Sequence, residues 1–195
     1  MLSLRIIPIP LPAISGVVCI LRLDVTGEES IPRTLSASKE VSMNVFEYLD
    51  QSNAHYAVSE HAPTYSAQVM AAEEHEKGRY VAKPVIVNSE GSHIMCVLAA
   101  PDKVVFDKLR DYLGTDDVTL APEEETREIF ADCEEGAEPP FGRLYGLRTI
   151  MDSSLEDDDH IVFQAGAHDK AIRMSMSDYL VMAQPEIVDF AYRPE

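Results

Sequence analysis

Two runs of apolar residues, 82–88 and 93–99, are rich in valine and isoleucine and flank a short polar turn around Gly91. Two such runs joined by a glycine-containing turn predict a β-hairpin. Shorter apolar or alternating segments predict further strands at 55–59, 145–151, 160–165, 171–174 and 186–192. The predicted strands are therefore spread along the chain.

Helical spacing of apolar residues alternates with these strands. The first helix is predicted to begin at Ser38, whose hydroxyl can cap it, because Val41, Val45 and Leu49 follow at helical intervals. Further helices are predicted after Pro63–Thr64, over 104–113 with a stop at Gly114, after Pro122 with its three glutamates, and after a cap at Ser175. Helices interleave with hairpin-linked strands and no βαβ repeat is evident. This order predicts an α+β fold with a mixed, mainly antiparallel sheet and surrounding helices.

The length and composition suit one domain. The chain has 195 residues, of which 46% are hydrophobic, and this is enough for one well-buried core. We expect that domain over residues 38–195. Residues 1–37 differ, because Pro8, Pro10 and Pro12 interrupt an apolar stretch that is too short to span a membrane. We interpret 1–37 as a disordered or artefactual extension, with a signal peptide and an upstream start codon as alternatives.

The charge balance is strongly acidic. The chain carries 34 acidic and 16 basic side chains, for a formal net charge of −18. Solubility is one explanation of this charge. The other is a surface that repels extended nucleic acid, since binding along many phosphates depends on lysine and arginine. Any nucleic-acid contact is therefore expected to be small, such as one terminus of the nucleic acid held by a few neighbouring basic side chains.

Standard catalytic and metal-binding motifs are missing from the sequence. It contains no GxSxG, Walker or dinucleotide-binding motif. Its three cysteines form no CxxC and indicate a reducing, cytoplasmic location without a disulfide framework. Its six histidines lack zinc-site spacing, so we expect no metal and no cofactor.

Three local features can carry chemistry. Lys83 lies in an apolar strand, where it is either a snorkelling side chain or a cation that anchors a phosphate or carbonyl oxygen. Gly136–Gly142 is a Gly/Pro loop that is either a plain surface turn or a backbone that presents N–H groups to a ligand. His168, in the turn Gly166-Ala167-His168, is either solvated or catalytic.

Taken in order, these features resemble the YbaK/prolyl-tRNA synthetase associated domain family. Glu60–Gln68 resembles the family's opening EH-x-x-x-T-A-x-E segment, and Lys83 stands where the family has its AKT lysine. Gly136–Gly142 fits the GxxxPFG signature. Phe163–His168 and Ile172–Ser175 resemble the Gly-x-His and Ile-Arg-Leu-Ser ending. The similarity runs from about residue 40 to the C-terminus, and the order of the motifs makes it specific.

The resemblance implies a free-standing editing domain that hydrolyses mischarged aminoacyl-tRNA and so serves translation fidelity. The Gly-x-His form favours the Ala-tRNA(Pro) branch, with Cys-tRNA(Pro) as an alternative. It implies binding of the tRNA acceptor end, with a synthetase as a further candidate partner, and no membrane. The implied catalytic residue is Lys83. The implied substrate-binding residues are Gly136, Pro140, Phe141, Gly142, Gly166 and His168, with Tyr65 and His61 at the pocket rim.

One residue departs from the family pattern. Pro84 follows Lys83 where the family usually has threonine, whose hydroxyl can help to position substrate. Proline also removes one N–H donor from the strand. This departure supports a second possible function, that of a catalytically weak or inactive module that binds aminoacyl-tRNA. An interaction domain recruited through its acidic face is a third possibility, and a metal hydrolase is the least favoured.

Overall fold

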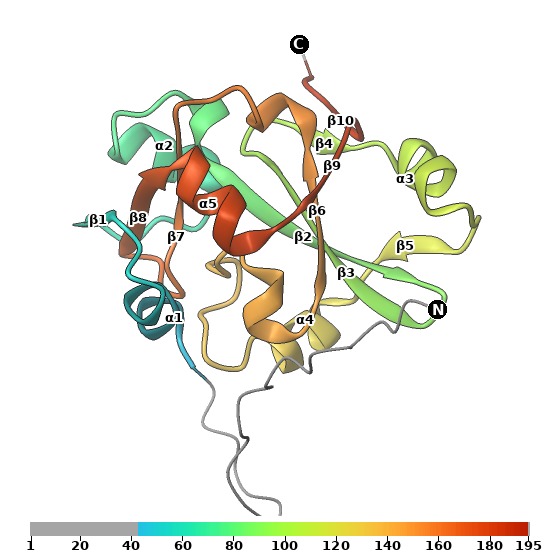
Figure 1. Ribbon diagram of the computed structural model, residues 1–195, viewed down its shortest axis with the longest axis horizontal. Helices are drawn as coiled ribbons and strands as arrows, with labels where there is room; N and C mark the ends of the chain where they lie inside the picture. The colour runs from blue at the N-terminus through green and yellow to red at the C-terminus, as the bar shows by residue number, and fades with distance from the viewer. Residues whose placement is uncertain (1–42, 195) are drawn as a thin grey trace, which may run out of the picture. The chain divides into compact units, whose positions relative to one another are not determined.

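The computed structural model describes residues 43–194, which form an α+β domain with mixed and mainly antiparallel sheets, as predicted (Figure 1). The larger sheet has the strand order β5-β2-β3-β6-β9, and a three-stranded sheet has the order β1-β8-β7. The strands of these two sheets are β1 Tyr56–Glu60, β2 Ala82–Ser89, β3 Ser92–Ala99, β5 Val118–Leu120, β6 Arg148–Asp152, β7 His160–Gln164, β8 Lys170–Ser175 and β9 Glu186–Val188. A short pair, β4 Lys103–Val104 and β10 Ala191–Tyr192, completes the strands of this region.

The predicted hairpin is confirmed as β2 and β3, which pair antiparallel from Ala82–Ala99 to Ser89–Ser92. The larger sheet is mixed because β6 pairs parallel to β3 and β9 pairs parallel to β6. The two sheets meet at a single parallel bridge between Val81 and Val162. Beyond that bridge, β2 and β7 belong to different sheets, and this separation creates the space in which the candidate site lies.

Five α-helices surround the sheets of the described region. They are α1 Val45–Gln51, α2 Ala67–Glu73, α3 Phe106–Leu113, α4 Glu123–Ile129 and α5 Met176–Ala183. Gly114 ends α3 in a left-handed conformation and Ser175 caps α5, both as predicted. Three predicted helix starts are wrong. Helix α1 begins after Asn44, which forms a capping box with Glu47, and α2 begins after Ser66. Helix α3 begins at Phe106, because Val104 belongs to β4. Ser38 and Val41 lie outside the described residues.

The main core fills the space between the two sheets. Strand residues such as Ile86, Met95 and Phe163 pack there against Leu49 of α1 and Tyr179 of α5. Helix α3 covers the opposite face of the larger sheet, and α2 covers the opposite face of the smaller one. Each sheet is therefore buried on both faces, which fixes the positions of β2 and β7 relative to one another.

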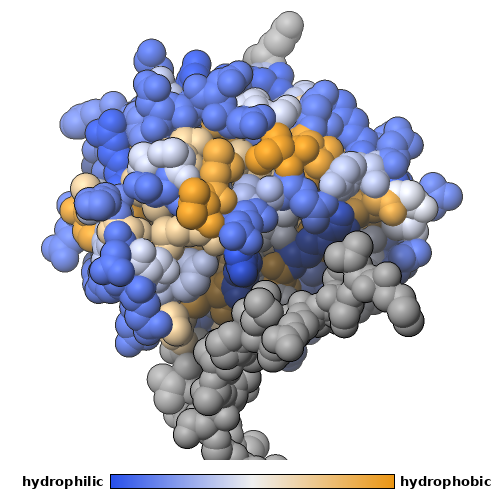
Figure 2. Space-filling view, viewed as in Figure 1, coloured by the Kyte–Doolittle hydropathy of each residue, from blue (hydrophilic) through white to orange (hydrophobic). Residues whose placement is uncertain are grey.

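An apolar patch interrupts a mostly hydrophilic face. Figure 2 shows it over α5 and β9, where Val181 and Ile187 are among the exposed large apolar residues. Among the described residues, no helix is both long and apolar enough to cross a membrane.

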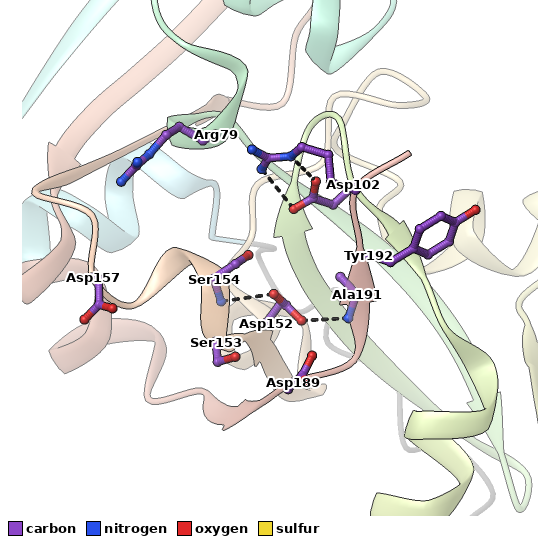
Figure 3. Close-up of a pocket in the computed structure, with 10 residues that line it drawn as sticks. Arg79, Asp102, Asp152, Ser153, Ser154, Asp157, Asp189, Ala191 and Tyr192 are labelled. Carbon is purple, nitrogen blue, oxygen red and sulfur yellow. Dashed lines mark hydrogen bonds and ion pairs between the residues drawn. The ribbon is translucent and has the colours of Figure 1, made fainter. Parts of the chain in front are cut away.

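The C-terminal segment is held to the larger sheet by Asp152. The carboxylate of Asp152 accepts hydrogen bonds from the backbone N–H groups of Ser154, Phe190 and Ala191 at 3.0, 2.9 and 2.7 Å. Figure 3 shows Asp152 between Ser154 and Ala191, beside β10. Burial opposes ionisation of this carboxyl, but the hydrogen bonds outweigh burial and lower its pKa. Asp152 therefore stabilises the fold as an anion.

We expect Asp152→Asn to destabilise the protein at neutral pH by roughly 1–3 kcal/mol, because the amide nitrogen cannot accept the N–H bonds. A lowered native pKa means that the stabilisation is present above the unfolded value of about 3.9 and is lost as the pH falls through the native pKa. The difference between the variant and the wild type should thus shrink below about pH 4. Urea unfolding from pH 3 to pH 7 checks this, and a difference that stays constant would contradict it.

Candidate active site

The candidate site is a cavity of about 240 Å³ at the split between the two sheets. Its lining comes from α2 and the residue before it, from the start of β2, from the Gly136–Gly142 loop and from the end of β7. The lining residues are Ser66, Ala67, Gln68, Ala82, Lys83, Pro84, Gly136, Glu138 and Gln164. Lys83 and Gly136, which lie far apart in the sequence, thus face one space.

Lys83 is the cation of this cavity. Its Nζ donates a hydrogen bond to the carbonyl oxygen of Ala100 at 2.8 Å, and Gln68 donates to the same oxygen at 2.9 Å. Lys83 is half-buried and also borders a second hollow that contains Asp102. Burial lowers its pKa, while the charge of Asp102 acts in the opposite direction. With one N–H engaged, the ammonium keeps two donors for a ligand.

The backbone of Pro84 faces away from β3. The carbonyl oxygen of Val81 accepts the N–H of Ala100, which follows β3. The carbonyl oxygen of Ile86 accepts the N–H of Ala121, which follows β5 on the other side of β2. Because strand residues alternate in the direction of their backbone groups, Pro84 shares the orientation of Ile86. Proline at position 84 therefore removes no hydrogen bond between β2 and β3. The predicted loss of a donor from the strand has no consequence for this pairing.

The Gly136–Gly142 loop reaches the cavity with its first residues. Gly136 has a φ of +86°, a conformation that favours glycine, and its N–H donates to the carboxylate of Glu138 at 2.9 Å. Ala137 is buried, and its carbonyl accepts the N–H of Gly166 at 2.9 Å. The loop is therefore tied to the Gly166 turn, rather than being a free surface turn.

The last residues of this loop anchor it in the core. Phe141 is fully buried, with ring edges against Tyr48, Phe163 and Tyr179 at centroid distances of 5.6, 5.4 and 5.3 Å. The hydroxyl of Tyr179 donates to the carbonyl of Pro140 at 2.8 Å. A Cβ on Gly142 would lie within van der Waals radii of Thr149 and Leu147. These three loop residues anchor the cavity wall in the core, and they do not line the cavity in this structure.

His168 lies next to Gly136 but is not among the residues that line the cavity. Its Nδ1 is 2.9 Å from the carbonyl oxygen of Thr64, so the neutral ring carries its proton on Nδ1 and leaves Nε2 as an acceptor. Gln164 donates to the same carbonyl oxygen at 2.8 Å. The Cε1 atom of His168 would be 3.8 Å from a Cβ on Gly136, so this edge of the ring faces the loop. His168 and Gly136 are thus brought together, as the sequence predicts.

The structure places three further predicted residues at different positions relative to His168: Gly166, Tyr65 and His61. Gly166, with a φ of +85°, lies against Cys133 and supports the turn below His168. Tyr65 is 79% exposed and its ring centroid lies 4.6 Å from that of His168, which is consistent with a rim position. His61 is turned away, with Nδ1 2.8 Å from the Ala62 carbonyl and Nε2 3.8 Å from Glu74. In this structure His61 does not line the cavity.

Sequence reasoning missed four polar residues of the cavity, of which Ser66 is the capping residue of α2. Gln164 is a buried side chain at the end of an otherwise apolar strand, and this break in the pattern was the available signal. Glu138 lies inside the glycine–proline loop, where the sequence indicates Gly136, Pro140, Phe141 and Gly142 instead. Gln68 lies on α2 and carries no signal of its own in the sequence.

A larger hollow of about 510 Å³ lies beside β10, where Asp102 and Asp152 are lining residues (Figure 3). Asp102 is held by the guanidinium of Arg193 at 2.7 Å, and Asp152 is held by backbone N–H groups. These carboxylates are already satisfied by protein donors, which indicates a structural role. Within residues 43–194, no cluster of three or more histidine, cysteine or acidic side chains is placed to hold a metal ion.

Comparison with known proteins agrees with this geometry. The family model of the aminoacyl-tRNA editing domain matches residues 61–181, which include Lys83, the Gly136–Gly142 loop and His168. The chain therefore belongs to the aminoacyl-tRNA editing domain family, and the resemblance seen in the sequence is confirmed.

Two relatives in Escherichia coli, from strains K12 and O157:H7, are both named multifunctional Ser/Thr-tRNA deacylase ProXp-y. Each is 36% identical over 104 residues, which is 53% of this chain and 62% of the relative. The aligned part thus spans less than two thirds of the relatives' length.

Solved structures show the same fold. A crystal structure of the hypothetical protein APE2540 has a TM-score of 0.70 at 17% identity and covers 76% of this chain and 99% of that chain. A candidate trans-editing enzyme for prolyl tRNA synthetase has a TM-score of 0.64 at 19% identity, over 71% and 87% of the two chains.

Proposed function

We propose that this protein hydrolyses the ester bond of mischarged aminoacyl-tRNA. The observation that carries the proposal is the position of Lys83, a half-buried cation in a small cavity that Gly136 and Glu138 also line, within the region that the editing-domain model matches. An aminoacyl ester is already activated, so a strong nucleophile is not required. Positioning of the ester and of water, together with donors to the developing oxyanion, supplies the catalysis.

In this proposal Lys83 provides the electrostatic contribution. Its two remaining N–H donors reach either the ester carbonyl oxygen or the phosphate of the terminal adenosine. The loop at Gly136 limits the space for the amino-acid side chain, and His168 contacts the aminoacyl group with its Nε2 edge. Tyr65 supplies an exposed ring at the rim, against which the terminal base can stack.

The proposed substrates carry serine or threonine. The cavity is small and its lining includes the polar side chains of Ser66, Gln68 and Gln164, which suit a hydroxyl group. A site that hydrogen-bonds a substrate hydroxyl discriminates against an analogue that lacks it. The names of the Escherichia coli relatives point the same way. Alanine, which the Gly-x-His segment favours, is the second candidate.

The test is a deacylation panel with tRNA charged with serine, threonine, alanine, cysteine or proline. We expect seryl- and threonyl-tRNA to be hydrolysed fastest, and the prolyl ester to decay at the rate of the buffer control because proline fills too much of the cavity. If alanyl-tRNA is hydrolysed faster than seryl- and threonyl-tRNA, alanine becomes the proposed amino acid of the substrate. Decay of every ester at the buffer rate would refute the proposed activity.

The possibility of an inactive binding module depends on Pro84. The missing N–H of Pro84 costs no hydrogen bond with β3, so it gives this possibility no support. The missing hydroxyl is the argument that remains, and the panel decides it. Contact with tRNA is proposed to stay at the acceptor end, because the net charge of −18 opposes a longer interface. A synthetase partner, a cytoplasmic location and the extent of the domain from residue 38 stay predictions.

A further inference from the structure

Glu138 is the acidic side chain of the candidate cavity. Among the described residues that line the cavity, the ionisable ones are Glu138 and Lys83. A carboxylate beside a site proposed to bind tRNA needs an explanation, because it repels phosphate. The explanation must lie in a positively charged group of the ligand.

The carboxylate of Glu138 is held in one orientation. Its Oε1 accepts the N–H of Gly136 at 2.9 Å, and the positive φ of Gly136 turns that N–H toward it. The chain continues into Pro139 and Pro140, which are buried, and then into the core at Phe141. The carboxylate therefore sits on an anchored loop, and Oε2 keeps its capacity to accept a hydrogen bond.

Glu138 and Lys83 do not neutralise each other. In the part of the chain that the structure describes, no ion pair joins them, and the nitrogen of Lys83 is directed to the carbonyl of Ala100. The cavity thus presents a cation and an anion at separate positions. Its ligand should carry the complementary pair of charges, with a negative or polarised oxygen at one point and an ammonium at another.

We propose that Glu138 binds the α-ammonium group of the aminoacyl moiety. This inference depends on the proposed function. Every aminoacyl ester carries a free α-amino group close to the ester, whereas a peptidyl or N-acylated ester has an uncharged amide at that position. Glu138 thus restricts the site to tRNA that carries a free amino acid, so that peptidyl-tRNA is not cleaved.

The variant that tests this is Glu138→Gln, assayed on seryl-tRNA and on N-acetyl-seryl-tRNA. Glutamine keeps an oxygen acceptor for the N–H of Gly136 but removes the charge. A charge-assisted hydrogen bond is typically worth a factor of roughly 10–100 in affinity, so kcat/KM for seryl-tRNA should fall by about that factor, mainly through KM. The slow rate on N-acetyl-seryl-tRNA should stay within about twofold, because that substrate has no charge to lose.

Glu135→Gln, directly before the same loop, is the matched control. Glu135 is exposed, pairs with Arg127 at 2.8 Å and does not line the cavity, so its variant should match the wild type on both substrates. An equal loss on both substrates in Glu138→Gln would assign Glu138 a structural role and overturn the inference. No loss on seryl-tRNA would overturn it as well.

A binding measurement separates this inference from the proposed activity. The probe is 3′-amino-3′-deoxyadenosine carrying serine in amide linkage, compared with its N-acetyl derivative by calorimetry. Wild-type protein should bind the free amine more tightly, and Glu138→Gln should bind both alike. If the wild type binds the two probes equally, the inference fails even where deacylation is observed. If it prefers the amine but no ester is hydrolysed, only the proposed activity fails.

Discussion

Replacing Lys83 with alanine is expected to reduce kcat/KM for seryl-tRNA by about 100-fold or more, since removal of one donor to a developing oxyanion typically costs roughly 10²–10³ in rate. The alanine side chain leaves the carbonyl of Ala100 with the hydrogen bond from Gln68, so the cavity wall keeps a polar contact. Lys83→Met, which retains the apolar stem without the charge, should lose a similar factor. Single-turnover deacylation measures both variants.

Lys108→Ala is the control for a general effect of lost positive charge. Lys108 pairs with Asp189 on the surface at 2.6 Å and does not line the cavity, so this variant should keep wild-type activity. Thermal unfolding of Lys83→Ala should stay close to that of the wild type. Deacylation at the wild-type rate by Lys83→Ala would remove Lys83 from the mechanism.

Replacing Phe141 with alanine is expected to destabilise the domain by roughly 3–5 kcal/mol, the range for truncation of a buried aromatic side chain. Its ring contacts three aromatic neighbours, on α1, β7 and α5, and none of them can fill the space without leaving its own position. The loop that carries Gly136 and Glu138 would lose its anchor. Activity should therefore fall at temperatures where the domain is still folded. Urea unfolding and deacylation on the same preparation test the two effects.

Phe141→Leu is the comparison for this prediction. Leucine fills part of the volume of the phenylalanine ring, so Phe141→Leu should lose clearly less free energy of unfolding than Phe141→Ala. A loss below about 1 kcal/mol for Phe141→Ala would mean that the aromatic cluster is not the anchor of the loop.

Local patterns predict the five α-helices and most strands, but not β4 and β5 and not all of the element ends. The β2–β3 hairpin follows directly from two apolar runs and the turn at Gly91. The sequence predicts too early a start for α1 because Ser38 is a good cap by type. Asn44 instead offers both halves of a capping box, with Glu47 as its partner. Residue preference alone cannot rank two capping residues on the same approach to a helix.

Of the residues that line the candidate cavity, the sequence predicts Lys83 and Gly136, but it does not predict the shape of the cavity. The structure brings Lys83 and Gly136 to one cavity and places His168 next to Gly136. The contribution of Gln164 and Glu138 depends on the separation of β2 from β7 beyond the Val81–Val162 bridge. That separation is a long-range property of two sheets, and no local spacing encodes it.

Pro84 lies in β2 at the point where the two sheets separate. The parallel bridge at Val81 and Val162 places the backbone of the even-numbered residues of β2 on the side of β7. At the next such position an amide hydrogen could have extended the pairing toward Gln164 and drawn the sheets together. Proline has no hydrogen to offer there. Pro84, the residue that departs from the family pattern, thus cannot continue the pairing of β2 with β7. It leaves no unsatisfied amide in the cavity wall. It also offers no N–H with which an extended chain in the opening could pair as an added strand.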